Sequence, residues 1–327
     1  MTAGVGFLVV GSPRSGTTLV QRLACEIPGV AMPAETHFFS QFVTGLMTRQ
    51  TFPLHTPVLE EEIGRFAALD SSRGLDVDVA AVVHSLGGQC RSPYALFDAL
   101  VSQLAGPAEV RGEKTPEHLM WWRPLSRAAP ELRFVVVVRD PRAVVASNLA
   151  MPWRQEGRVP AWGENVHLAF AEMWACLQEQ VHLMTAVLGP DRLLRLRYED
   201  VATDPDATRD RIALFLGRPP VTVPAAAPQK IVLEWEPWKQ AALGPVVADN
   251  LEAWRQSLGA QRADEVAALC RTGMQSFGYG DEAPSVLSAV RTRARLGPLW
   301  TARLLRYRRT YRGYLAAIDR RRLSDHE

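Results

Sequence analysis

The chain lacks the common markers of disulfide-rich, zinc-binding and membrane-spanning proteins. Its four cysteines are isolated, with no Cys-x-x-Cys pair: Cys25, Cys90, Cys176 and Cys270. This spacing argues against a disulfide framework or a zinc site and fits a reducing cytoplasm. No apolar run approaches the roughly 20 residues that span a bilayer. Because Met1 leads almost directly into an apolar strand, we expect no signal peptide.

A large excess of charge is also missing. The 37 Lys and Arg residues against 35 Asp and Glu leave a net charge of +2 over 327 residues, so nothing overall favours nucleic acid as a partner. Apolar residues make up 47% of the chain and charged residues 22%, which is typical of an ordinary globular protein. The length is enough for one large α/β domain with insertions. Frequent Ala, Arg, Gly and Pro residues favour a bacterial origin.

The most informative stretch is FLVVGSPRSGTTLVQRL, residues 7–23. Four apolar residues predict a buried strand, and Thr17 and Thr18 begin a helix. The turn between them has two glycines separated by four residues, the spacing of a phosphate-binding loop. Thr17 stands where such loops in nucleotide kinases carry Lys, and Arg14 supplies the positive charge instead. The stretch therefore predicts an anion site that does not hold Mg-ATP in the usual way.

A second stretch, LRFVVVVRDPRAVVASNLA at 132–150, also joins a strand to a helix. Its β-branched run at 134–138 is typical of a strand buried on both faces of a parallel sheet. Arg139 ends this strand, Asp140 is the expected N-cap of the next helix, and Ser147 lies on that helix. A guanidinium and a hydroxyl placed in this way suit a phosphate.

Together these stretches resemble the nucleotide-binding elements of sulfotransferases that use 3′-phosphoadenosine-5′-phosphosulfate (PAPS). The resemblance implies that the first loop binds the 5′-phosphosulfate, and that Arg139 and Ser147 bind the 3′-phosphate. Residues 111–119, RGEKTPEHL, and 198–201, YEDV, are similar to segments of the branch that includes tyrosylprotein sulfotransferases. The cofactor-binding residues implied in this way are Arg14, Ser15, Gly16, Thr17, Thr18, Arg139, Ser147, Tyr198 and Lys239.

The resemblance also implies catalytic residues. Glu35 corresponds to the general base of that branch, and a partly dry pocket can raise the pKa of such a carboxyl toward working pH. His37 is the rival base, because the cytosolic sulfotransferases use His. Arg14 and Lys114 are the candidates for stabilising charge on the transferring group, and this chemistry requires no metal. We expect His118 to be structural, orienting Lys114 or a loop carbonyl.

Strand and helix patterns alternate along the chain and predict an α/β fold, with a P-loop-like parallel sheet flanked by helices. Further strands are expected at 29–32, 109–113 and 192–197, and helices at 58–69, 95–104 and 161–188. Residues 36–107 show helical patterns without a sheet signal, which predicts a helical insertion over the active-site mouth that shapes the acceptor pocket. We place a single domain at 1–285 and a basic amphipathic helix in the tail, 286–327.

The leading interpretation is a PAPS-dependent sulfotransferase that acts on a hydroxyl of a small molecule, natural product or glycolipid and releases adenosine 3′,5′-bisphosphate. One alternative is a P-loop nucleotide kinase, which the missing loop Lys disfavours. Another is a non-catalytic module that binds a nucleotide or a membrane through the basic tail. That tail could contact anionic lipid, a partner or the substrate mouth of its own enzyme. The expected location is the cytoplasm, in solution or at a membrane surface.

Overall fold

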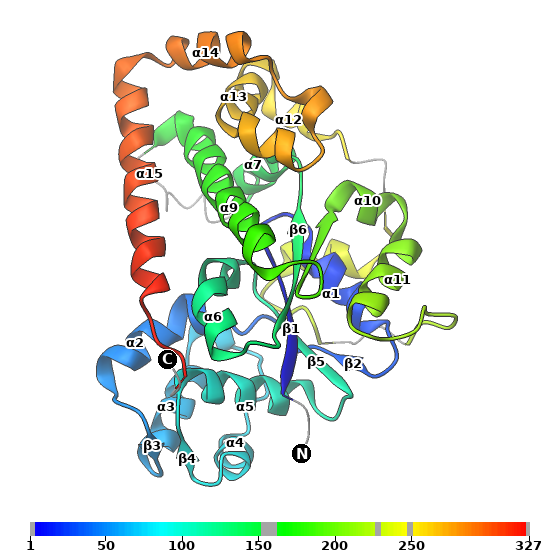
Figure 1. The fold of residues 1–327 in the computed structure, drawn as a ribbon, viewed down its shortest axis with the longest axis vertical. Helices are drawn as coiled ribbons and strands as arrows, with labels where there is room; N and C mark the ends of the chain where they lie inside the picture. Colours follow the sequence, from blue (N-terminus) through cyan, green and yellow to red (C-terminus); the bar gives the residue numbers. More distant parts are fainter. Residues whose placement is uncertain (1–3, 152–161, 226–229, 247–250, 325–327) are drawn as a thin grey trace.

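A five-stranded parallel sheet lies at the centre of the protein, in the order β2-β5-β1-β6-β7 (Figure 1). The computed structural model describes residues 4–151, 162–225, 230–246 and 251–324. The strands are β1 (Val5–Gly11), β2 (Val30–Ala31), β5 (Val110–Lys114), β6 (Arg133–Val138) and β7 (Leu193–Arg197). All neighbours in this sheet pair in parallel. The predicted strands are confirmed, each within two residues of its expected bounds.

The two faces of the central strands bury two different apolar clusters. Phe7 and Val9 of β1 pack in one cluster, and Leu8 and Val10 pack in the other. The first cluster includes side chains of α1 (Thr17–Cys25) and α11 (Pro205–Phe215), and the second includes those of α7 (Pro141–Leu149) and α9 (Val166–Leu188). Because side chains alternate across a strand, an uninterrupted apolar run is required where helices cover both faces. The predicted α/β fold is confirmed.

The region 36–107 is mostly helical, as expected. Its elements are η1 (Phe38–Phe42), α2 (Val43–Arg49), α3 (Val58–Ala67), η2 (Asp70–Ser72), α4 (Val79–Ser85) and α5 (Pro93–Ala105). It also contains an antiparallel pair that we did not predict, β3 (Leu54–His55) with β4 (Gln89–Cys90). Two residues per strand are too few to show an alternating pattern. α5 packs at the start of β1, where the Val5 amide donates to Asp98 at 2.6 Å.

The remaining elements before the tail lie between residues 116 and 282. They are η3 (Pro116–Trp121), α6 (Trp122–Ala128), η4 (Gly163–Asn165), α10 (Tyr198–Thr203), η5 (Pro237–Leu243), α12 (Trp254–Leu258), α13 (Ala260–Ser276) and η7 (Gly280–Glu282). The predicted helix start at residue 161 lies outside the described residues, as do residues 1–3 at the expected chain start and 325–327 of the tail. Within the described ranges, every helix is too short or too polar to cross a bilayer.

The tail forms two helices rather than the single helix we expected. α14 (Val286–Arg295) and α15 (Gly297–Asp319) meet at Gly297, whose φ of +76° turns the chain. α15 then runs along α9 (Figure 1). Arg312 pairs with Glu179 on α9 at 2.8 Å, and Leu304 and Ile318 are buried beneath the helix.

Candidate functional site

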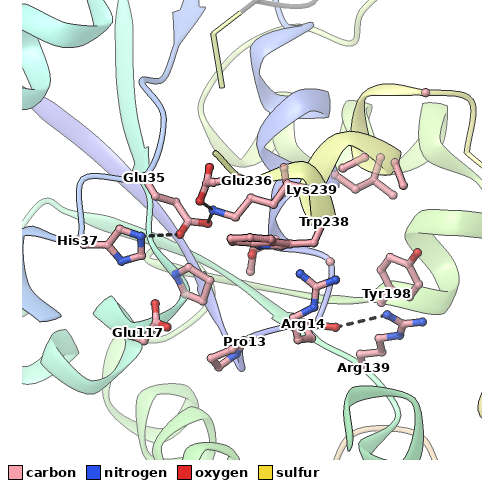
Figure 2. Close-up of a pocket in the computed structure, with 18 of the residues that line it drawn as sticks. Pro13, Arg14, Glu35, His37, Glu117, Arg139, Tyr198, Glu236, Trp238 and Lys239 are labelled. Carbon is pink, nitrogen blue, oxygen red and sulfur yellow. Dashed lines mark hydrogen bonds and ion pairs between the residues drawn. The ribbon is translucent and has the colours of Figure 1, made fainter. Parts of the chain in front are cut away.

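A cavity of about 770 Å³ opens at the carboxyl end of the sheet, beside the loop after β1 (Figure 2). The predicted site residues that line it are Arg14, Gly16, Thr17, Thr18, Glu35, Arg139, Tyr198 and Lys239. Lys114 and Ser147 lie behind this wall and hydrogen-bond to Thr18 and Arg14, respectively. Ser15 is buried within the loop. The fold therefore brings together residues from six separate segments of the chain.

The loop between β1 and α1 has two residues in the left-handed region of the backbone. Arg14 has a φ of +72° and Gly16 a φ of +93°. A Cβ on Gly16 would lie 2.1 Å from Cδ2 of Tyr198, so only glycine allows the ring this close to the loop. α1 begins at the next residue, Thr17, and its first amides lack partners within the helix. A tight loop before a helix N-terminus is the geometry of an anion site.

Two guanidinium groups converge on this loop. Arg139 lies 4.2 Å from the ring centroid of Tyr198, and its Nη1 donates to the backbone oxygen of Arg14 at 3.3 Å. Nε of Arg14 donates to Oγ of Ser147 at 3.0 Å. Burial and the charge of Arg139 lower the pKa of Arg14. Nε of Arg139 and Oγ of Ser15 are buried without hydrogen-bond partners. Like charges and orphaned polar atoms together indicate a site for an anion.

The start of α7 fixes the position of Arg139. The carboxylate of Asp140 accepts a hydrogen bond of 2.7 Å from the amide of Arg142, which confirms Asp140 as the N-cap. The backbone oxygen of Arg139 accepts a hydrogen bond of 3.1 Å from the indole of Trp174 on α9. The strand end and the next helix thus hold the guanidinium at the cavity wall.

Glu35 forms the centre of a second charged group. Its side chain is 5% exposed and contacts the fully buried ammonium of Lys114. Oε1 of Glu35 also lies 2.7 Å from Nζ of Lys239, and Oε2 lies 3.1 Å from Nε2 of His37. Nζ of Lys114 donates to Oγ1 of Thr18 at 3.1 Å, which connects this group to the start of α1.

These contacts reverse the pKa shift that we expected for Glu35. Burial alone raises the pKa of Glu35, but Lys114, His37 and Lys239 lower it to well below its ordinary value. Burial lowers the pKa of Lys114 in spite of the nearby carboxylate. Burial also opposes the charged form of His37, yet the hydrogen bond with Glu35 raises its pKa. The cationic side chains around Glu35 therefore favour its ionised form.

Glu236 and Trp238 line the cavity but were not among the predicted site residues. Both belong to the segment WEPWK at 235–239, whose paired tryptophans were the available signal. Glu236 contacts Lys239, so that this ammonium lies between two carboxylates. Oxygen and nitrogen atoms of Glu35, His37 and Glu236 lie within 4.8 Å of one another, a spacing that could hold a metal ion. Here the ammonium groups already neutralise the two carboxylates.

His118 has the structural role that we expected, although it orients a backbone segment rather than Lys114. It is fully buried, and its Nε2 accepts a hydrogen bond of 3.2 Å from the amide of Phe39. This leaves Nδ1 to donate to Glu113 at 2.9 Å. Glu113 in turn accepts from the amide and hydroxyl of Thr36 at 3.1 and 2.9 Å. The end of β5 therefore holds the segment that carries Glu35.

The segment 235–246, and not the bulk of the insertion, covers the cavity. From the region 36–107, only His37 and Gln41 are among the described lining residues. Nη1 of Arg22 on α1 donates to the backbone oxygen of Ala242 at 2.9 Å, which joins η5 to the helix after the loop. This differs from the predicted cover, because α5 and its neighbours pack toward the other end of the sheet.

Residues 7–222 match the family model described as "Sulfotransferase family". A carbohydrate sulfotransferase 3 from Tetronarce californica is 29% identical over 166 residues, which cover 45% of this chain and 36% of that protein. A putative protein-tyrosine sulfotransferase from Caenorhabditis briggsae is 24% identical over 210 residues, 64% of each chain. The chain thus spans less than two thirds of the length of both curated relatives.

The fold is shared with a solved structure, the sulfotransferase domain of the Synechococcus PCC 7002 olefin synthase. The TM-score is 0.50 at 18% identity, and the match covers 82% of this chain and 93% of that domain. At this level of identity the likeness concerns the fold alone.

Proposed function

Since the chain belongs to the sulfotransferase family, we propose that it transfers a sulfuryl group from PAPS to a hydroxyl of a small molecule, natural product or glycolipid. The observation that carries this proposal is the pair Arg14 and Arg139 beside the loop after β1, with Nε of Arg139 buried and unpartnered. The two guanidinium groups repel each other and leave a donor without a partner. A bound anion would offset the repulsion and accept hydrogen bonds from both groups.

The residues around the loop fit such a cofactor. Arg139 and Ser147 would hold the 3′-phosphate, and residues 12–18, with the first amides of α1, would hold the 5′ end. Tyr198 packs against Gly16 and under Arg139, where it can contact the nucleotide. When bound, PAPS supplies the sulfuryl group and leaves as adenosine 3′,5′-bisphosphate. Lys239, on the covering segment, would close over it.

Glu35 is the proposed general base, and its contact with Lys114 indicates how its basicity would rise when an anion binds at the loop. Lys114 already reaches Thr18 at the helix start, so an anion at the loop competes with Glu35 for this ammonium. Any such competition removes a cause of the low pKa of Glu35 and makes it a better proton acceptor. The hydrogen bond with Glu35 raises the pKa of His37. Because a protonated imidazole cannot accept a proton, this shift favours Glu35 over His37 as the base.

The roles of the remaining charges follow from their positions. As Glu35 accepts the proton of the acceptor hydroxyl, that oxygen forms a bond to sulfur, and the bond from sulfur to the 5′-phosphate oxygen breaks. Negative charge develops on the transferring group and on the leaving oxygen, and Arg14 and Lys114 are placed to stabilise it. None of these steps assigns a role to a metal.

Titration of the purified protein by calorimetry in the presence of EDTA tests the cofactor. We expect adenosine 3′,5′-bisphosphate to bind at least about tenfold more tightly than adenosine 5′-phosphate, because the second phosphate gains charge-assisted bonds. Equal affinities would contradict the assignment of Arg139 and Ser147. Tighter binding of Mg-ATP, measured without EDTA, would favour the nucleotide kinase instead.

Two further parts of the proposal concern organisation and location. We propose a single catalytic domain at 1–285 with the tail 286–327 attached to it, and α15 packs on α9 of that domain. The four cysteines are free and buried, which supports a reducing compartment such as the cytoplasm. A peripheral membrane contact of the tail would use its outward residues, among them Leu299, which is 76% exposed.

A further inference from the structure

A second cavity of about 400 Å³ adjoins the first. It is lined by Pro13, Glu117, Met120, Met173, Leu177, Tyr307, Thr310, Tyr311 and Tyr314, and we name it the apolar groove. Its walls come from η3, α9 and α15, so the tail helix builds one side of it. Pro13 and Glu117 line both cavities, which makes the groove continuous with the candidate active site.

The shared residues lie on the acceptor side of the site. Pro13 directly precedes Arg14 in the loop, and Figure 2 shows Glu117 beside His37, away from Tyr198 and Arg139. A molecule whose hydroxyl meets Glu35 therefore has the entrance of the groove next to it. A nucleotide held at Arg139, as proposed, would lie away from Glu117 at that entrance.

The tail presents an ordered aromatic wall. The rings of Tyr307 and Tyr311 are stacked at an interplanar angle of 16°, with their centroids 6.2 Å apart. The hydroxyl of Tyr311 donates to Sδ of Met120 at 3.2 Å, so this polar group is already used. Arg308 contacts Glu172 of α9, which fixes the middle of the helix. Because these side chains are already ordered, little free energy is lost in ordering them when a ligand binds.

The charge and polarity of the side chains that line the groove indicate which kind of molecule it can bind. Among the described lining residues, Glu117 alone has a charged side chain, and its Oε2 is buried without a hydrogen-bond partner. Glu117 disfavours anionic acceptors by repulsion. A sugar would leave several hydroxyls against methionine, leucine and proline, where each unpaired group loses its hydrogen bonds to water.

We propose that α15 forms the acceptor-binding wall, and that the acceptor is an uncharged alcohol or phenol with an elongated apolar body lying along Tyr307, Tyr311 and Tyr314. This inference rests on the proposed sulfotransferase function and narrows its acceptor class. It also gives the tail a role at its own active site.

A series of para-alkylphenols tests the groove while keeping the reacting oxygen nearly constant. With phenol, 4-ethylphenol and 4-pentylphenol as acceptors, we expect the KM to fall about two- to fourfold for each added methylene, because each is removed from water. The kcat should change little, since the reacting group is unchanged. A KM that does not depend on chain length would overturn the inference.

Variants on the exposed side of α15 test whether the alkyl chain binds in the groove. Thr310→Glu places a charge in the groove, and Tyr314→Ser removes a ring that is 46% exposed, so both should fold. Thr301→Glu, on the same helix outside the groove, is the matched control. We expect both groove variants to weaken 4-pentylphenol binding at least about fivefold in calorimetry, with phenol binding and the control unchanged. Equal effects of Thr310→Glu and Thr301→Glu would contradict the location.

The two proposals fail in different ways. Transfer to phenol without any gain from longer chains would leave the sulfotransferase function standing and reject the groove. If adenosine 3′,5′-bisphosphate does not bind and no phenol is sulfated, the proposed function is wrong. In that case the groove is not an acceptor site, even where Thr310→Glu still weakens binding of 4-pentylphenol.

Discussion

Nζ of Lys239 lies 2.7 Å from Oε1 of Glu35, which joins the segment that covers the cavity to the proposed base. The same ammonium contacts Glu236, three residues before it. Lys239 therefore contacts the proposed base and also belongs to the segment that covers the cavity. As long as it pairs with Glu35, it stabilises the ionised carboxylate and weakens it as a proton acceptor.

The first prediction concerns pH. A base must be deprotonated, so activity falls as the pH drops through the pKa of Glu35, which the structure holds well below its ordinary value. Lys239→Met removes one cause of this lowering, so the acidic limb of the kcat/KM profile should move to higher pH. Lys230→Met is the control, because Lys230 is 79% exposed and pairs with Asp76. An unchanged acidic limb would mean that another group titrates there.

The second prediction concerns the identity of the base. Glu35→Gln keeps the size of the side chain but cannot accept a proton, so the kcat should fall by about 10²–10⁴-fold. Binding of adenosine 3′,5′-bisphosphate should stay close to normal. His37→Ala should have a smaller effect, because His37 acts through its bond to Glu35. If His37→Ala abolishes turnover and Glu35→Gln does not, the histidine is the base.

The third prediction concerns the 3′-phosphate. Arg139→Met should weaken binding of adenosine 3′,5′-bisphosphate by about 1.5–3 kcal/mol, roughly 10- to 150-fold, and leave adenosine 5′-phosphate less affected. Arg306→Met, on the exposed face of α15, is the control. Calorimetry of both nucleotides measures the selectivity. A parallel loss for the two nucleotides would place Arg139 elsewhere on the cofactor.

The fourth prediction separates the function of Arg14 from its structure. Its φ of +72° is a conformation that glycine adopts without steric cost. Arg14→Gly should therefore keep the Tm close to that of the wild type while turnover falls strongly, since the guanidinium is lost. Thermal unfolding and a transfer assay give the two values. Wild-type turnover in the folded variant would remove Arg14 from the mechanism.

The fifth prediction concerns the contact of Gly16 with Tyr198. Gly16→Ala combines a positive φ with a Cβ at 2.1 Å from the ring, and should lower the free energy of unfolding by about 2 kcal/mol or more. Gly313→Ala on α15 is the opposite case, because its Cβ would meet open space. That variant should gain up to about 1 kcal/mol from helix propensity. Equal stabilities would show that the loop relaxes around the new methyl group.

The sequence by itself determined the strands, the loop and the helix starts on which the site is built. A short apolar run followed by turn residues, and rich in β-branched residues in β6, is typical of a buried strand, so β1 and β6 could be predicted from local pattern. The glycine loop before Thr17 and the Asp140 cap are likewise set by neighbouring residues. Because the carboxyl ends of parallel strands lie at one edge of the sheet, β1, β5 and β6 bring Arg14, Lys114 and Arg139 to the same edge.

The tertiary structure decided everything that depends on partners distant in sequence. Whether Glu35 has a raised or a lowered pKa depends on two lysines from β5 and the segment 235–246, and no local pattern states that they meet. The same holds for the tail, whose basic, aromatic sequence suits a lipid surface as well as an acceptor wall. Only its packing on α9 placed Tyr311 in the apolar groove that adjoins the candidate site, because the neighbours of a helix face are set by the tertiary structure.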